Sequence, residues 1–505
     1  MKYPTTDAGE EQIAAAQADW NASSTSWRPV PGLRDLKLAE RVAANLEAEV
    51  IAAGWPVGAL IGTEEQLLAR YGVGRAVLRE AFRLTEHRQI ARVRLGRNGG
   101  LVVIAPTSSA VEESLAIYLD YVGVSVEEIF EVRSILESFS VVSATTGIDE
   151  EHVAMFRNLA EVALTNGASA NLGGQQFHEL IAEATGNVAL SLFIHALTFL
   201  TAHPRDEAST SRSEFKSFDD RVRNDHAEIS KAILTGDELM AREAMVKHVK
   251  YLRDRAARPR KNSRVDNGIE PRELDTNQSR GSDLQRSAAT VATRIRDEIV
   301  QKGWPVGQSL GFENELLERY GVGRAQFREA ARILESHSVI QMRRGIGGGM
   351  VITAPDSQAT MRAGALYLRF RNVQSVQIRD LREELEVASV RLAIERLNAD
   401  GIVTLERVVE REQNWSDDQF PVVSHDLHGV IADLSGNRPL ALLISILMQI
   451  TAEKLYSGDP ARVTEPPDAI RKAHQAIVAA IIDRDVPLAS RRIRKHLRAV
   501  ASYTV

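Results

Sequence analysis

The feature that most constrains this chain of 505 residues is an internal repeat. The segment GWPVG stands at residues 54–58 and again at 303–307. A longer segment, RYGVGRAVLREA at 70–81, returns as RYGVGRAQFREA at 319–330. The offset is 249 residues in both cases, so no residue has been gained or lost between the two matches. We interpret the chain as a tandem duplication, and its length predicts several domains rather than one core.

Composition excludes several classes of protein. The chain has no cysteine, so disulfides and thiolate metal sites are excluded, and an intracellular compartment fits. Residues 1–10 carry acids and no apolar core, unlike a secretory signal. The longest apolar stretch, 440–448, is far shorter than the roughly 20 residues that span a bilayer. We therefore expect a cytoplasmic, nucleoid-associated protein without a membrane partner.

Charge is distributed unevenly along the chain. The formal net charge of −6 excludes a uniformly basic nucleic-acid binder, so a DNA-facing surface must be local. Residues 70–97 hold eight arginines against two glutamates, and residues 319–346 hold six against two. Because phosphate contacts supply most non-specific affinity for DNA, these two stretches are the candidate contact regions.

Hydrophobic periodicity predicts the same elements in both halves. Each half begins with an amphipathic helix, continues into two short helical segments and a hairpin, and ends in long helices. In the first half, Gly96, Gly99 and Gly100 are expected to make the hairpin turn. The first helices have apolar faces made by Leu38, Val42, Leu46 and Val50, and by Val291, Ile295 and Ile299. The predicted hairpin strands are Ile90–Arg94 and Leu101–Ile104, then Ile340–Arg344 and Met350–Thr353.

The predicted fold class is mainly α, with two winged helix-turn-helix domains that are each followed by an all-α helical-bundle ligand domain. Residues 1–33 are rich in Ala, Ser, Thr and Asp and are expected to be a mostly disordered extension, and residues 256–285 have almost no large apolar residues and are expected to be a flexible linker. The boundaries are 1–33 (extension), 34–107 (first winged domain), 112–255 (first helical domain), 256–285 (linker), 286–356 (second winged domain) and 359–505 (second helical domain).

The repeated segment has the pattern of a helix-turn-helix, in which the second helix lies in the major groove of DNA. Arginine suits guanine because its planar fork donates two parallel hydrogen bonds to O6 and N7. We predict DNA contacts from four arginines on the second helices and four that flank the hairpin turns. They are Arg75, Arg79, Arg324 and Arg328, and Arg94, Arg97, Arg343 and Arg344.

The run TEEQLLARYGVGRAVLREAFRLTEHRQI, followed by GRNGG, resembles the winged helix-turn-helix of GntR-family bacterial repressors. The second copy resembles the same family pattern equally well, with the sequence ENELLERYGVGRAQFREAARILESHSVIQMRRGIGGG. With the helical segments downstream, the resemblance covers nearly the whole chain and points to the FadR-like subgroup, whose helical ligand-binding domain is called FCD. It implies that the four arginines of the second helices contact bases and phosphates. Both copies depart from the family's GVSR pattern, with Gly74 and Gly323 in place of serine, and Glu65 and Asn314 stand where several members carry a further arginine.

The two copies also differ from each other in the segments expected to read DNA. Val77 corresponds to Gln326, and Arg97 to Ile346. We therefore predict a double-stranded DNA operator with two similar but not identical half-sites. A linker of some 30 residues spans about 30 Å root-mean-square, close to one duplex turn of about 34 Å. A single chain can thus act as a pseudo-dimer, and a homo-oligomer stays open.

Histidines recur in register in the two helical domains. His226 and His248 are 22 residues apart, as are His474 and His496, and His178 and His428 precede the pairs in matching contexts. Neutral imidazole is a common ligand for Zn, Ni, Mn or Fe, so we predict one divalent metal site in each helical domain. The alternative is that these histidines are ordinary core residues.

In metal-binding FCD proteins the resemblance implies a further ligand, an aspartate four residues before the first histidine. Gly174 and Ser424 stand at that position here, so the metal is either held by three histidines or absent. Asp426 lies on another face of the helix, and His425 is the nearer substitute. The resemblance also implies that Arg133 and Arg382 face an organic-acid effector. An intrahelical pair with Glu137 or Glu386 explains these arginines equally well.

Three alternatives remain beside a transcription regulator with a small-molecule effector. A zinc hydrolase would need a second histidine at Ala182 to complete H-E-x-x-H, and no other catalytic signature is present, so we predict no enzyme activity. A nucleotide-binding loop is disfavoured because the glycines at 345–349 lead into a strand rather than a helix. The third alternative is an architectural DNA-binding protein without an effector, whose DNA affinity would not change when a ligand is added.

Overall fold

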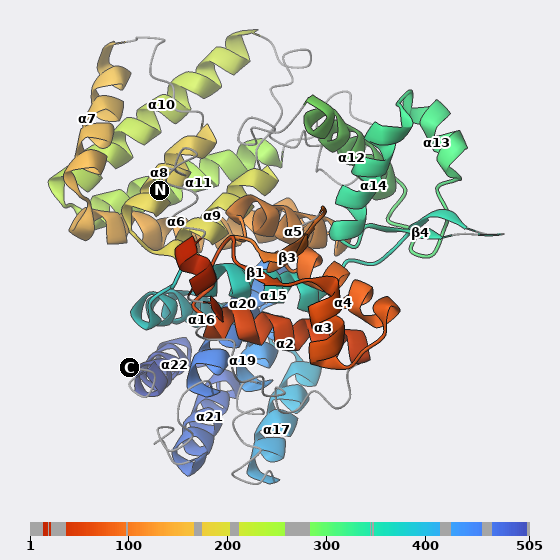
Figure 1. Cartoon of the computed structure of the whole chain (residues 1–505). Coiled ribbons are helices and arrows are strands. Elements are labelled where there is room, and N and C mark those ends of the chain that lie inside the picture. Colours follow the sequence, from red (N-terminus) through yellow and green to blue (C-terminus); the bar gives the residue numbers. More distant parts are fainter. Residues whose placement is uncertain are drawn as a thin grey trace. The chain divides into compact units, whose positions relative to one another are not determined.

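The structure, a computed structural model, describes residues 14–18, 20–21, 37–96, 99–165, 174–201, 212–257, 283–343, 345, 348–414, 426–456 and 467–501. The chain divides into two compact units, Met1–Val111 and Glu112–Val505. The fold is mainly helical with a few short antiparallel strands (Figure 1), which confirms the predicted class.

The first unit contains a winged helix-turn-helix. Its two short helices meet at Gly72, whose φ of 62° is a left-handed conformation that glycine adopts at little cost. In the wing, Ala91 pairs with Val103 and Arg94 with Gly100. The elements are α2 (Leu38–Ala52), β1 (Leu60–Gly62), α3 (Glu64–Tyr71), α4 (Arg75–His87), β2 (Ala91–Arg94) and β3 (Gly100–Val103).

A third strand that the sequence did not predict completes the wing sheet. β1 pairs antiparallel with β3, which gives the order β1-β3-β2. Gly100, expected in the hairpin turn, lies in β3 instead. A Cβ at Gly100 would lie 2.4 Å from the carbonyl oxygen of Gly62, so glycine is what lets β1 approach. The second winged module repeats this, because a Cβ at Gly349 would lie 2.3 Å from the oxygen of Gly311.

Part of the segment predicted to be disordered is folded. Residues 14–18 and 20–21 are helical, and Trp20 is buried. The Gln17 side chain accepts a hydrogen bond from the amide of Leu60 at 2.8 Å and donates one to its carbonyl at 3.2 Å. The prediction of disorder is therefore wrong for these residues, and the rest of 1–33 lies outside the described residues. Leu38, expected on the inward face of α2, is exposed in the first turn of that helix.

The second winged module repeats the first. Its first helix begins at Asp283, inside the predicted linker, and residues 258–282 lie outside the described residues. Where the first module has a third strand, the second has a single bridge between Ser309 and Val351. Its elements are α12 (Asp283–Gln301), α13 (Glu313–Tyr320), α14 (Arg324–Ser336), β4 (Ile340–Arg343) and β5 (Gly349–Ile352), with β4 and β5 antiparallel.

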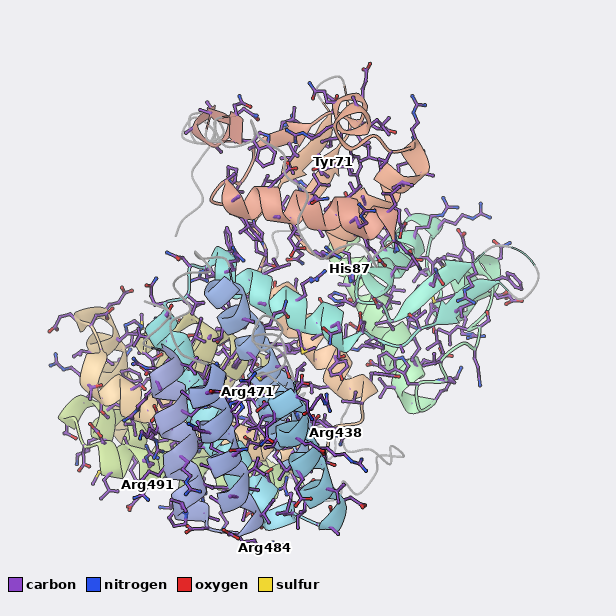
Figure 2. All side chains as sticks on the ribbon, turned by 90° about the horizontal axis from the view of Figure 1, so that it is seen from below. Tyr71, His87, Arg438, Arg471, Arg484 and Arg491 are labelled. Atoms are coloured by element: carbon purple, nitrogen blue, oxygen red, sulfur yellow. The ribbon has the colours of Figure 1, made fainter. Side chains whose placement is uncertain are left out.

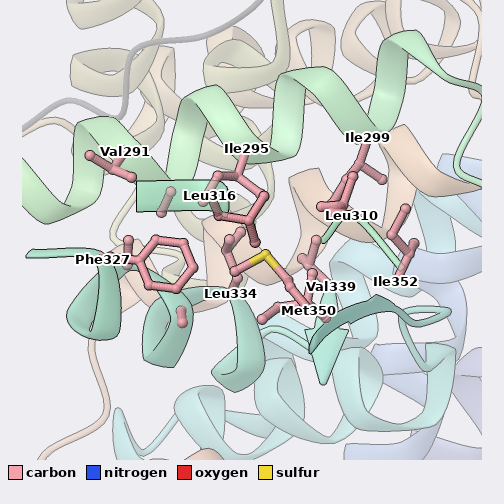
Figure 3. Close-up of a cluster of buried hydrophobic side chains, with 14 of the residues drawn as sticks. Val291, Ile295, Ile299, Leu310, Leu316, Phe327, Leu334, Val339, Met350 and Ile352 are labelled. Carbon is pink, nitrogen blue, oxygen red and sulfur yellow. The ribbon is translucent and has the colours of Figure 1, made fainter. Parts of the chain in front are cut away.

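The core of this module is aliphatic (Figure 3). Val291, Ile295 and Ile299 lie along one face of α12, as their i+4 spacing predicts. They belong to one buried cluster with Phe327 of α14 and Met350 of β5. Burial of a single side chain of this size stabilises a fold by about 1.5–3 kcal/mol, so this face holds the module together.

The helix that opens the first helical domain, α5 (Ser108–Tyr121), contributes to the same core. Ile117 is buried in it, and the Tyr121 ring packs edge-on against Trp304 with centroids 5.4 Å apart. A Glu113 carboxylate oxygen lies 3.3 Å from Nε2 of His337. The second winged module is therefore anchored on a helix of the other half of the chain.

The two helical domains have matching sets of helices. Among the described residues, no helix is long and apolar enough to cross a membrane. After α5, the first domain consists of α6 (Val126–Gly147), α7 (Glu150–Thr165), α8 (Gly174–Ala184), α9 (Val188–Thr201), α10 (Arg212–Thr235) and α11 (Glu238–Ala256). The second consists of α15 (Ser357–Phe370), α16 (Ser375–Arg396), α17 (Ala399–Asn414), α19 (Asp426–Leu434), α20 (Arg438–Tyr456), α21 (Pro467–Ile482) and α22 (Val486–Ala501).

Candidate nucleic-acid interface and candidate metal centres

The second helix of each helix-turn-helix begins at an exposed arginine. α4 starts at Arg75 and α14 at Arg324, and the glycine before each is extended and makes no side-chain cap. A Cβ on Gly74 or Gly323 would meet nothing within 4 Å, so the module itself does not require glycine there. The uncapped amides leave the positive end of the helix dipole open to an anion such as a DNA phosphate.

A second arginine on each of these helices pairs with a glutamate of the preceding helix. Arg79 Nε lies 3.6 Å from a Glu64 oxygen, and Arg328 Nε lies 3.1 Å from a Glu313 oxygen. Both arginine side chains are about two-thirds exposed, at 70% and 65%. Exposed pairs contribute little stability, so each guanidinium can exchange its glutamate for a phosphate.

The wing arginines are described in part. Arg94 and Arg343 are exposed at the ends of β2 and β4, and Arg343 donates to the Gln341 side chain at 3.1 Å. Arg97 and Arg344 lie outside the described residues. The predicted DNA-contacting arginines that are described therefore all lie on exposed parts of the winged modules.

A partly buried polar contact joins the first two helices of the winged module, and sequence reasoning missed it. Tyr71 (labelled in Figure 2) donates to a Glu49 oxygen at 2.8 Å, and Arg70 donates to the other oxygen at 3.0 Å. Burial and the neighbouring Glu49 carboxylate raise the pKa of Tyr71 well above its ordinary value. In the second module Tyr320 donates to Glu298 in the same way. The Arg-Tyr pair that recurs in both repeats is the sequence pattern from which this contact could have been predicted.

Three histidines converge in the first helical domain. His178 of α8, His226 of α10 and His248 of α11 are all buried, and one nitrogen of each lies within 4.8 Å of the others. The Nε2 atoms of His226 and His248 are 3.2 Å apart. We call this group the first histidine trio.

The second helical domain contains the same arrangement, the second histidine trio. His428 of α19, His474 of α21 and His496 of α22 are buried, and Nε2 of His496 lies 3.2 Å from that of His474 and 3.3 Å from that of His428. Centroid distances in corresponding pairs agree closely: 5.2 and 5.2 Å, 4.8 and 4.7 Å, and 5.7 and 5.4 Å. The structure thus brings together both sets of histidines that the sequence grouped.

Buried carboxylates orient the histidines. Nδ1 of His178 lies 2.5 Å from a Glu137 oxygen, and Nδ1 of His428 lies 2.5 Å from a Glu386 oxygen. A carboxylate at Nδ1 fixes the tautomer that leaves the Nε2 lone pair free, which is the usual outer-sphere contact of a metal-bound imidazole. The sequence had offered these two glutamates only as partners of Arg133 and Arg382.

A second carboxylate acts differently in the two halves. In the first trio, Asp225 lies 3.2 Å from Nδ1 of His248. In the second, Glu412 of α17 lies 2.9 Å from Nδ1 of His474. Sequence reasoning singled out neither acid. In each trio two imidazoles therefore have an acidic side chain beside Nδ1. They are His178 and His248 in the first trio, and His428 and His474, which are not the equivalent pair, in the second.

Burial favours the neutral form of His178, His226, His428 and His474. Burial lowers the pKa of His178 to about 4 although Glu137 opposes the shift, and burial lowers the pKa of His474 to about 4 as well. Burial also lowers the pKa of His226 well below its ordinary value. For Glu137 burial favours the protonated form, but the adjacent Arg133 and His178 outweigh it and lower its pKa to about 2. A neutral His178 beside an ionised Glu137 is the protonation state that a metal site needs, whereas burial raises the pKa of Glu412, the acid beside His474, to about 8.

The trios fit a divalent metal. Among the described residues, the buried Nε2 atom of His178 has no hydrogen-bond partner, which is costly unless the atom binds something. Zn–N bonds of 2.0–2.1 Å at tetrahedral angles place two nitrogens about 3.3–3.4 Å apart. The observed Nε2 separations of 3.2 and 3.3 Å are close to this.

The position of the missing family aspartate is open in the first half. Gly174 is exposed at the start of α8, and a Cβ there would meet nothing within 4 Å. Ser424 and His425 lie outside the described residues. Asp426 pairs with Arg411 at 3.1 Å, in keeping with its assignment to another helix face.

Arg133 and Arg382 are buried beside the trios. Arg133 Nε donates to Glu137 at 2.7 Å and its terminal nitrogen donates to Thr201 at 2.6 Å. Arg382 Nε donates to Glu386 at 2.7 Å. The intrahelical pairs offered as the alternative to effector binding are thus formed, and each links an arginine through one carboxylate to a histidine of the trio.

Three segments of the chain match known protein families. Residues 128–251 and 377–499 match the FCD domain, and residues 287–349 match the bacterial regulatory proteins of the gntR family. The chain is 26% identical over 216 residues to the HTH-type transcriptional repressor NanR of Enterobacter sp. (strain 638), covering 42% of this chain and 83% of the relative. It is 28% identical over 233 residues to the uncharacterized HTH-type transcriptional regulator YcbG of Bacillus subtilis (strain 168), covering 46% and 94%. Among solved structures, Streptococcus agalactiae GntR is 24% identical, with a TM-score of 0.34 over 43% of this chain and 99% of that one.

Two winged helix-turn-helix modules, each followed by a helical bundle, define a transcription regulator of tandem architecture. The chain belongs to the GntR family of bacterial regulatory proteins and carries two FCD domains. Each relative matches less than half of this chain over most of its own length, so one relative corresponds to one half of the duplication.

Proposed function

We propose that this chain is a sequence-specific DNA-binding regulator whose operator affinity is set by an organic-acid effector bound with a divalent metal in each helical domain. The observation that carries the proposal is the pair of matching buried histidine trios within a chain that also holds two winged modules. The name of the NanR relative supports repression as the direction of control.

The DNA-binding part of the proposal rests on exposed arginines in equivalent places. Arg75 and Arg324 begin the second helices, where the first residues face base edges in the major groove. Two residues after these arginines, the first helix has Val77, whose side chain cannot hydrogen-bond, and the second has Gln326, whose side chain can. The proposed operator therefore has two similar half-sites that are not identical, and one chain supplies both readers.

The effector part rests on the trios and the arginines beside them. His178, His226 and His248 would hold the metal in the first domain, and a bound metal would supply an open coordination position for an effector carboxylate. Arg133 keeps its guanidinium next to this site through Glu137. Glu137 and Asp225 hold the imidazoles in their ligating tautomers.

Effector binding would act by favouring one spacing of the two DNA-binding modules. Such couplings between sites are typically about 1–3 kcal/mol, or about 5–150-fold in affinity. The experiment is to select operators from a random DNA pool with the parent protein, measure the metal content of freshly purified chain, and repeat the binding with a chelator. About two metals per chain and a chelator-dependent affinity are the expected results.

Two outcomes would contradict the proposal separately. If Arg75→Ala with Arg324→Ala binds the selected DNA as tightly as the parent, the DNA-binding assignment is wrong, because each lost bidentate contact costs about 1–3 kcal/mol. If the chain holds no metal and chelator changes nothing, the metal assignment is wrong. A chain that binds DNA but responds to no metal or organic acid would instead be the architectural protein.

A further inference from the structure

The two helical domains contact each other at two equivalent places. At one, Asn437, which precedes α20, donates from Nδ2 to the backbone carbonyl of Glu128 at 2.9 Å. At the other, Asn187, which precedes α9, donates to the carbonyl of Gln377 at 3.2 Å. Glu128 and Gln377 are each the third residue of the corresponding helices α6 and α16. The contact thus has the form of a two-fold interface, made inside one chain.

The side chains at one of these places form a charged clamp. Arg438, next to Asn437, donates from Nε to Glu128 Oε1 at 2.8 Å and from a terminal nitrogen to Oε2 at 2.5 Å. The same guanidinium donates to the carbonyl oxygens of Val122 and Gly123, which follow α5. This bidentate, charge-assisted geometry is the strong form of an arginine–carboxylate contact.

Nearby contacts extend the clamp along α6. Arg396, at the end of α16, donates to Glu131 Oε1 at 2.8 Å, and Asn437 donates to Glu131 Oε2 at 2.8 Å. The clamp therefore joins two positions on successive turns of α6 to the second helical domain. A network of this kind is more stable than an isolated exposed pair.

Among the residues that the structure describes, the equivalent place on the other side has no charged clamp. Val188 stands where Arg438 would be, and Gln377 stands where Glu128 would be. The Gln377 side chain donates to the carbonyl of Gly186 at 2.7 Å. The backbone contact is common to both places, but the charges belong to one of them.

We propose that Arg438 and Glu128 make the pairing of the two helical domains heterotypic, so that each half recognises the other half of its own chain rather than a second copy of itself. Two first halves would bring Glu128 against Val188 at both places. Two second halves would bring Arg438 against Gln377 at both. Only the unlike pair places the guanidinium on the carboxylate. The proposal does not depend on an effector or a metal.

The first test reverses the charges in the full chain. Glu128→Arg and Arg438→Glu are each expected to lower the midpoint of thermal unfolding by about 2–4 °C, and the double variant is expected to recover most of the loss. Arg491→Glu, the same charge change at an exposed residue of α22 (Figure 2), is the matched control and should leave the midpoint unchanged. Arg438→Gln provides a milder variant if the reversal does not fold. If Arg438→Glu and Arg438→Gln behave like the control, or the double variant shows the sum of both losses, the proposal is wrong.

The second test asks whether the pair forms within one chain. Equal amounts of the two single reversals are mixed at low micromolar concentration without unfolding. Pairing between chains would bring opposite charges together again in the mixture, whereas pairing within a chain cannot. A mixture that melts as the sum of its two components, with each sedimenting as one chain, is the expected result. Recovery of the parent's midpoint on mixing would overturn the intramolecular assignment.

Discussion

Replacing Glu137 by glutamine should separate the two roles of this buried carboxylate. Glu137 accepts from Arg133 at 2.7 Å and lies 2.5 Å from Nδ1 of His178, and all three side chains are buried. It therefore neutralises a buried guanidinium and also orients a predicted metal ligand. Glutamine preserves the shape of the side chain but removes its charge.

The size of the effect follows from these contacts. Breaking a buried ion pair by neutralising one partner costs about 3–5 kcal/mol. We expect the lower end, because the glutamine oxygen can still accept from Arg133 and because Thr201 accepts a second hydrogen bond at 2.6 Å. Loss of an outer-sphere carboxylate typically weakens metal binding by about 10–100-fold. Glu137→Gln should therefore both destabilise the first helical domain and weaken zinc binding at one of two sites.

Arg133→Met is the matched control. It breaks the same ion pair and should destabilise the domain by a similar amount, but it leaves the Glu137 carboxylate on Nδ1 of His178. Zinc is titrated into metal-free protein against a chromogenic chelator, and unfolding is followed by denaturant. If Arg133→Met weakens zinc binding as much as Glu137→Gln, or if neither variant does so, the carboxylate does not orient a ligand and the reasoning fails.

Three further predictions address other contacts. Gly174→Asp, which restores the family ligand at an open position, should tighten zinc binding to the first trio by roughly tenfold or more in the same competition assay, and unchanged affinity would contradict the assigned position. Burial favours the protonated form of Glu128, but hydrogen bonds from Arg438 lower its pKa to about 2, so its contribution to stability is present above about pH 4.5 and is lost as pH falls towards 2. Because Arg438 is 47% exposed, we expect only about 1 kcal/mol, and Glu128→Gln should flatten acid denaturation over this range, whereas an unchanged profile would count against it. Glu313→Gln, which frees Arg328, should strengthen operator binding by about 1.5–5-fold in a titration at fixed salt, and weaker binding would refute a phosphate role for that arginine.

Local patterns in the sequence were sufficient for the helices and the hairpin of the winged modules. The i+4 spacing of Val291, Ile295 and Ile299 predicted the buried face of α12, and the repeated GWPVG marked the end of the first helix. The structure explains why tryptophan belongs to this repeat. Trp55 and Trp304 both adopt positive φ, and each indole donates at 2.8 Å to a carbonyl just beyond the wing strand.

The histidine positions could be predicted, but their surroundings could not. The spacing of 22 residues places His226 and His248 on two consecutive helices, which sequence periodicity can suggest. The carboxylate on His474 comes from Glu412, in a helix separated by 62 residues. No local pattern specifies which acid of a distant helix meets a given imidazole, because that depends on how the bundle packs. The third strand of the wing was missed for a related reason, since three residues are too few for an alternating pattern.

Fusion of the two halves in one chain explains how the two histidine trios can be so similar while the contacts between the helical domains differ. In a symmetric homodimer every substitution appears twice, so an arginine introduced at one end of the interface also appears at the other. In a single chain, Arg438 can pair with Glu128 while the equivalent positions hold the uncharged Val188 and Gln377. The same freedom applies to Val77 and Gln326 on the second helices of the two helix-turn-helix modules. A duplicated chain can therefore keep equivalent histidine trios and still recognise an asymmetric operator, which a homodimer of one half could read only by accepting a mismatch at one half-site.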